Sequence, residues 1–94
     1  MAKFELGKLY LTCGVNNLIA EDKKFAKFVL ECVKKHAAGE WGKICEEDKI
    51  SNEEAVRFGN LRILSAYKNR NLPKIWIITE ADRSATTILF PDEY

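Results

Sequence analysis

Residues 61–90, LRILSAYKNRNLPKIWIITEADRSATTILF, carry the clearest indication of the fold class. Ile, Trp, Tyr and Thr, which favour β-strands, are concentrated in three runs, residues 61–68, 74–79 and 85–90. Asn69 to Pro73 separates the first two runs and Glu80 to Ser84 the last two, and both connections have the composition of turns. The stretch therefore predicts a three-stranded antiparallel meander.

The preceding two thirds of the chain predicts helices after one short strand. Lys8 to Thr12 alternates around two leucines and reads as a strand, after which Thr12 can cap a short helix. Asp22 can cap a longer helix, whose apolar side chains recur at offsets 0, 3, 4, 7, 8 and 11 as one stripe. These residues are Phe25, Phe28, Val29, Cys32, Val33 and His36.

A third, short helix is predicted after the acidic connection Glu46 to Lys49. Ser51 and Glu54 form the S-x-x-E pattern of a capping box, and Gly59 can end the helix. Ala55 and Phe58 are its expected buried face. The whole chain, residues 1–94, is thus predicted to be one α+β domain, with helices packed on the C-terminal meander.

Length and composition narrow the classes of protein further. The longest apolar runs fall far short of the roughly 20 residues that span a membrane, and Met1 to Gly7 lacks the apolar core of an export signal. Cys13, Cys32 and Cys45 show no C-x-x-C spacing, so we expect reduced, mostly buried thiols in a cytoplasmic protein. No metal site, cofactor or nucleotide-binding loop is expected, because none of the relevant motifs occurs.

Charge is nearly balanced, at +1 overall, but it is arranged in blocks. Residues 22–36 hold five lysines against two acids, whereas 40–54 hold six acids against two lysines. Residues 57–74 carry five basic side chains and no acid. Such alternation of charge is often only the complementary faces of a fold, although a basic run can also mark an anion-binding surface. The members of this basic run are Arg57, Arg62, Lys68, Arg70 and Lys74.

The densest cluster of functional groups is the predicted turn from Glu80 to Ser84. Arg83 could hold a phosphate while Glu80 or Asp82 acts as a base. Alternatively, Asp82 forms an Asx-turn with Ser84, and Arg83 pairs with a neighbouring carboxylate to fix the loop. The turn residues themselves favour the second interpretation modestly.

Two further side chains are candidates for chemistry. His36 has the unperturbed pKa that suits proton transfer near neutrality, although a histidine in a last helical turn more often bonds terminal carbonyls. Arg62 begins a predicted strand and could contact an anion, or could be a solvated strand end. Trp41 and Trp76 are expected to be core anchors.

Four segments together resemble a family of short bacterial proteins described as plasmid-related, carried by plasmids and integrative elements. They are H-x-x-G-x-W-G (36–42), E-D-K-x-x-N (47–52), R-x-x-S-x-Y (62–67) and W-I-I-T-E-A-D-R-S-x-T-T-x-L-x-P-x-E-Y (76–94). The resemblance covers about the last two thirds of the chain and implies a role in the biology of mobile genetic elements. The order of helices before a meander is also similar to small ribonucleases of the barnase and RelE kind, although no histidine lies in the strand-connecting turn.

Two functions follow from these observations. The first is a non-catalytic module that binds a protein, RNA or DNA partner through the basic run. The second is a metal-independent ribonuclease-like toxin or effector. The ribonuclease likeness implies that Glu80, Arg83, Arg62 and His36 would carry the reaction. The sequence leaves the choice between them, and the oligomeric state, open.

Overall fold

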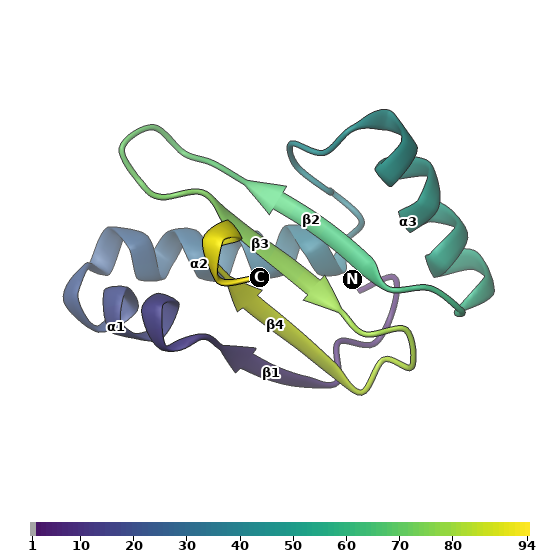
Figure 1. Ribbon diagram of the computed structural model, residues 1–94, viewed down its shortest axis with the longest axis horizontal. Coiled ribbons are helices and arrows are strands. Elements are labelled where there is room, and N and C mark those ends of the chain that lie inside the picture. Colours follow the sequence, from purple (N-terminus) through teal and green to yellow (C-terminus); the bar gives the residue numbers. More distant parts are fainter. Residues whose placement is uncertain (1) are drawn as a thin grey trace.

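The computed structural model describes residues 2–94 as three helices and a four-stranded mixed sheet (Figure 1). The strands are β1 (Lys8–Leu11), β2 (Ile63–Tyr67), β3 (Ile75–Thr79) and β4 (Ala85–Leu89). The helices are α1 (Cys13–Glu21), α2 (Lys23–Ala37) and α3 (Glu46–Phe58), and a 3-10 turn, η1 (Pro91–Glu93), follows β4. The predicted α+β class is confirmed.

The sheet has the strand order β1-β4-β3-β2. The meander is antiparallel as predicted, with Ile63 opposite Thr79 and Trp76 opposite Leu89. β1 adds a fourth strand parallel to β4, with Leu9 opposite Thr86. Helices α1 and α2 provide the connection between β1 and the rest of the chain, and α2 crosses behind the sheet (Figure 1).

The first two helices begin where their capping residues predict. The Thr12 hydroxyl accepts from the Val15 N–H, and the Asp22 carboxylate accepts from the N–H groups of Lys24 and Phe25. Each cap satisfies backbone donors that have no partner within the helix. The apolar stripe of α2 then packs on the helix-facing side of the sheet, around Phe25, Ile75, Ile77 and Ile88.

α3 lies beside β2 and differs from the prediction. It begins at Glu46, so Ser51 lies inside the helix and forms no capping box. Three acids in the first turn favour the earlier start, because they interact well with the positive end of the helix dipole. Gly59 ends the helix with φ +70°, as expected. Ala55 is buried, but Phe58 is 64% exposed, so that half of the predicted buried face is wrong.

The two edge strands of the sheet, β2 and β1, differ in how far other segments cover them. Along β2, the Asn52 amide donates to the Leu64 carbonyl and its oxygen accepts from the Leu64 N–H, at 2.6 and 3.1 Å. The segment around Gly42 also bonds the outer edge of β2 at Ala66. β1 forms the opposite edge and is exposed along its whole length.

Burial of the cysteines and tryptophans departs in part from expectation. Cys32 is buried, whereas Cys13 and Cys45 are exposed, so the thiols are not mostly buried. Trp41 is buried as a core anchor, and Trp76 is only partly buried, with its ring 5.8 Å from that of Tyr94. No helix in the described part of the chain is long and apolar enough to cross a membrane.

Candidate functional site

The Glu80 to Ser84 corner lies at the rim of the sheet, in the connection from β3 to β4. Glu80, Asp82 and Ser84 are exposed there. The Asp82 carboxylate accepts from the Ser84 N–H at 3.0 Å, which is the Asx-turn that the sequence offered as one interpretation. Hydrogen bonds from the Ser84 side chain and backbone hold the pKa of Asp82 below its ordinary value.

Arg83 joins this corner to the end of α3 by bonding backbone carbonyls. Its Nη1 donates to the carbonyls of Leu61, Glu80 and Ala81 at 2.8 to 3.1 Å, and its Nη2 donates to that of Ala55 at 2.8 Å. The carbonyl of Ala55 also accepts from the cap N–H of α3. The expected Arg83–carboxylate pair is therefore replaced by a cation at the negative end of the α3 dipole.

Arg62 lies at the same end of the sheet as the corner. Extending the antiparallel register beyond the Ile63–Thr79 pair places Arg62 beside Glu80. The Arg62 guanidinium is occupied elsewhere, because it donates to the Tyr94 hydroxyl at 2.5 Å and lies 5.6 Å from the centre of that ring. Arg62 thus holds Tyr94 against the sheet, where the Tyr94 ring also contacts the ring of Trp76.

His36 lies inside the molecule and is fully buried. Its Nδ1 is 2.6 Å from the Ser65 hydroxyl on β2, and its Nε2 is 2.8 Å from the Thr79 hydroxyl on β3. Thr79 is 2.7 Å from the Thr86 hydroxyl on β4, which donates to the carbonyl of Leu6. This buried chain ties α2 to three strands and to the N-terminal segment, in place of the terminal-carbonyl bonds expected from sequence.

The direction of these hydrogen bonds determines which ring nitrogen of His36 carries the proton. Because Thr86 donates to a carbonyl, it accepts from Thr79, and Thr79 in turn accepts from the Nε2–H of His36. Ser65 then donates to the unprotonated Nδ1. Burial lowers the pKa of His36 to about 4, so the ring is neutral near pH 7. A histidine without solvent contact cannot reach a substrate that lies at the Glu80 corner.

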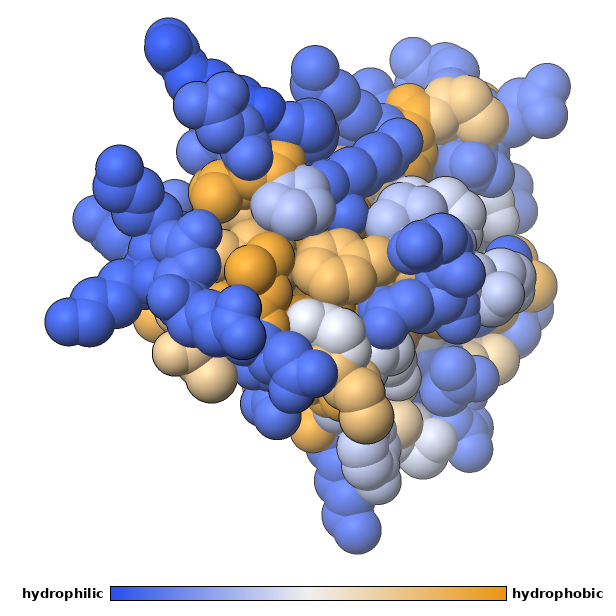
Figure 2. Space-filling view, turned by 60° about the vertical axis from the view of Figure 1, so that its left-hand side comes forward, coloured by the Kyte–Doolittle hydropathy of each residue, from blue (hydrophilic) through white to orange (hydrophobic). Residues whose placement is uncertain are grey.

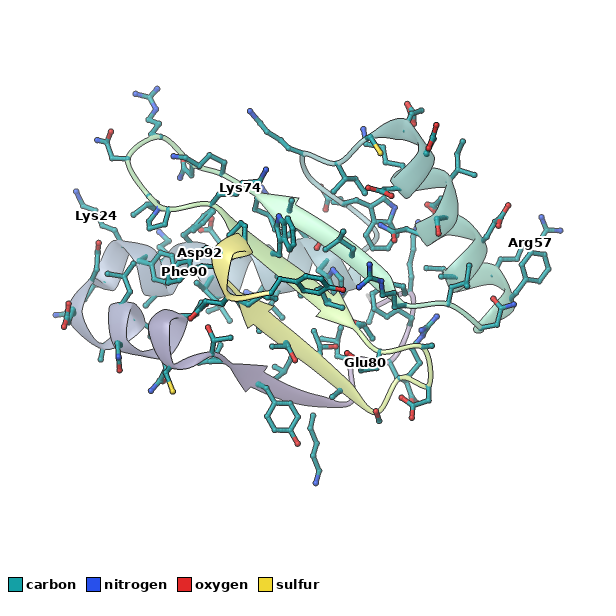
Figure 3. All side chains as sticks on the ribbon, in the orientation of Figure 1. Lys24, Arg57, Lys74, Glu80, Phe90 and Asp92 are labelled. Atoms are coloured by element: carbon teal, nitrogen blue, oxygen red, sulfur yellow. The ribbon has the colours of Figure 1, made fainter. Side chains whose placement is uncertain are left out.

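The basic run does not form one surface. Figure 3 shows Arg57 at the end of α3, whereas Lys74 lies well apart from it, close to Phe90 and Asp92. Lys74 lines an apolar hollow of about 640 Å³ together with Leu18, Phe90 and Asp92. Figure 2 turns the left-hand side of Figure 1 forward and shows hydrophobic surface at the centre of that view, surrounded by hydrophilic groups.

Lys68 and Arg70 belong to a different surface, which we term the α2–hairpin groove. It consists of two adjoining hollows of about 510 and 360 Å³ between α2 and the β2–β3 connection, which share Phe28, Glu31 and Asn69. Six basic residues and two acids line it. The basic residues are Lys24, Lys27, Lys35, Lys43, Lys68 and Arg70, and the acids are Asp22 and Glu31.

The sequence-based site omitted the four lysines that α2 and the Gly42 segment contribute to this groove. Lys24, Lys27 and Lys35 share one flank of α2 with Glu31, because spacings of 3, 4 and 4 residues return to the same side of a helix. That spacing was visible in the sequence. Their meeting with Arg70 depends on α2 crossing the sheet beneath the hairpin, which the local sequence does not specify.

Comparison with protein-family models, with curated proteins and with solved structures gives no match for this chain. Among residues 2–94, no group of three or more His, Cys, Asp or Glu side chains is placed to hold a metal ion.

Proposed function

We propose that the protein is a non-catalytic module that binds the phosphate backbone of a nucleic acid in the α2–hairpin groove. The observation that carries the proposal is the gathering of six basic side chains from three separate segments around one groove, against two acids. Basic side chains that follow a groove neutralise phosphates and release counterions, which provides most of sequence-independent affinity.

The dimensions of the groove fit a backbone ligand. Lys24 and Lys35 are separated by 11 positions along α2, or about 16 Å at the rise of an α-helix. The aromatic side chains in the groove, Phe28 and Tyr67, are buried and offer no face for base stacking. The module should consequently contact phosphates and show little sequence preference.

The alternative, a metal-independent ribonuclease, receives less support from the geometry. His36 is buried, Arg83 is engaged by four carbonyls and Arg62 by Tyr94, so Glu80 is left without a free arginine partner at the corner. A cytoplasmic setting is part of the proposal, since the exposed thiols of Cys13 and Cys45 would persist in a reducing compartment. The association with mobile elements remains a prediction from the family resemblance.

Binding of fluorescently labelled single-stranded and duplex oligonucleotides tests this function. The double variant Lys27→Glu/Arg70→Glu reverses two charges in the groove, and we expect it to weaken binding roughly tenfold or more in low salt. Arg57→Glu/Lys74→Glu makes the same change in net charge outside the groove and should bind nearly as the wild type does.

The salt dependence provides a second measurement. With at most six basic contacts, the slope of log K against log salt should not exceed about 4 for a single strand. Absence of binding at low salt, or equal losses in the two double variants, would refute the proposed groove. If a labelled RNA oligonucleotide is cleaved by the wild type and not by Glu80→Gln, the ribonuclease function would be favoured instead.

A further inference from the structure

β1 is the one edge of the sheet in residues 2–94 that no other segment covers. Its side chains Leu9, Tyr10 and Leu11 are 53, 51 and 41% exposed. A free edge exposes backbone N–H and C=O groups that can pair with another strand. Proteins usually prevent such pairing with charged side chains, prolines or a covering segment. β2 is protected in that way by Asn52 and the Gly42 segment, whereas β1 combines an open edge with apolar side chains.

The backbone of β1 has a defined set of free groups. Lys8 N–H donates to the Ser84 carbonyl and Thr12 N–H to the Ile88 carbonyl, both toward β4. Because successive residues of a strand direct these groups to alternate sides, the N–H and C=O groups of Leu9 and Leu11 point away from β4. The free edge therefore offers two donors and two acceptors, centred on Tyr10.

We propose that the occupant of this edge is β1 of a second copy of the chain, paired antiparallel about a two-fold axis at Tyr10. In this register Leu9 lies opposite Leu11 of the second copy, and all the outward groups of both residues are used, giving four backbone hydrogen bonds. Tyr10 lies opposite its own symmetry mate. The pairing is isologous, as closed dimers require, and continues the sheet to eight strands.

Charge and side-chain pattern favour a second copy over an unrelated strand. Lys8 is the only charged residue of β1, and this register places it opposite Thr12 of the second copy, so no like charges face each other. Leu9 and Leu11 of both copies lie on the side of the sheet that faces the helices, and Tyr10 of both copies lies on the opposite side. The contact is shorter than a standard interface, so the dimer should dissociate on dilution.

Cysteine cross-linking tests the register directly, in a background where the exposed Cys13 and Cys45 are replaced by serine. Tyr10→Cys places two thiols in a non-hydrogen-bonded pair, whose Cα atoms are about 4.5 Å apart and within disulfide reach. Mild oxidation at high protein concentration should yield a covalent dimer. Lys8→Cys is the matched control, since four residues separate it from its symmetry mate, about 13 Å along the strands.

Sedimentation equilibrium over a concentration series gives the second readout. Wild-type protein should shift from monomer to dimer as concentration rises, and Leu9→Lys/Leu11→Lys should weaken dimerisation roughly tenfold or more by placing lysines opposite lysines. Circular dichroism of that variant should match the wild type. A wild type that stays monomeric at millimolar concentration, or Lys8→Cys cross-linking as well as Tyr10→Cys, would overturn the proposal; so would a dimer that Tyr10→Cys does not trap.

Discussion

Lowering the pH from 8 to 5 should destabilise the protein mainly through the protonation of His36. The pKa of this histidine is about 4 in the folded state, against an ordinary value of 6.5. The unfolded chain therefore binds more protons between these values, and the contribution of the neutral ring is complete above pH 6.5 and lost as the pH falls toward 4. The direction of the effect is a loss of stability on acidification.

The magnitude follows from the two pKa values. A shift of this size corresponds to about 3 kcal/mol in total, of which about 2 kcal/mol is lost by pH 5. For a domain of this length, 2 kcal/mol lowers the melting temperature by roughly 8 to 16 °C. Protonation of Nδ1 would also require the Ser65 hydroxyl to reverse, because it donates to that nitrogen in the neutral form.

Thermal melts followed by circular dichroism at closely spaced pH values measure this effect. The control is His36→Gln, whose amide can still donate and accept but does not titrate, and its melting temperature should be nearly constant from pH 8 to 5 even if it is lower throughout. A wild-type curve that is flat across this range, or a variant with the same slope as the wild type, would show that the buried imidazole is not the titrating group.

Two further predictions concern contacts that hold α3 in place. Asn52→Ala leaves the N–H and C=O of Leu64 without their partner, and we expect a loss of about 2–3 kcal/mol in urea denaturation; an unchanged midpoint would mean that water replaces the amide. Arg83→Ala removes the donors to Ala55 and three other carbonyls and should destabilise by about 1–3 kcal/mol, whereas the exposed Glu80→Gln should melt like the wild type. If Arg83→Ala has the melting temperature of the wild type, the hydrogen bonds from Arg83 to these carbonyls contribute little to stability.

Elements that depend on local interactions could be predicted from the amino-acid sequence. The meander followed from β-branched and aromatic runs separated by turn residues, and the caps Thr12 and Asp22 marked the starts of α1 and α2. The Asx-turn of Asp82 was also visible, because its partner is two residues away. The start of α3 was missed because its acidic first turn outweighed the capping-box pattern at Ser51.

The positions of the functional groups depend on contacts between residues far apart in the sequence. His36 faces Ser65 and Thr79, 29 and 43 residues away, and that contact turns a candidate acid into a buried structural group. The predicted basic run was divided by the path of the chain, since Arg57 and Arg70 lie in different hollows. Local patterns specify which face of an element is apolar, but the crossing of α2 over the sheet, set by packing of the whole core, determines which charges meet.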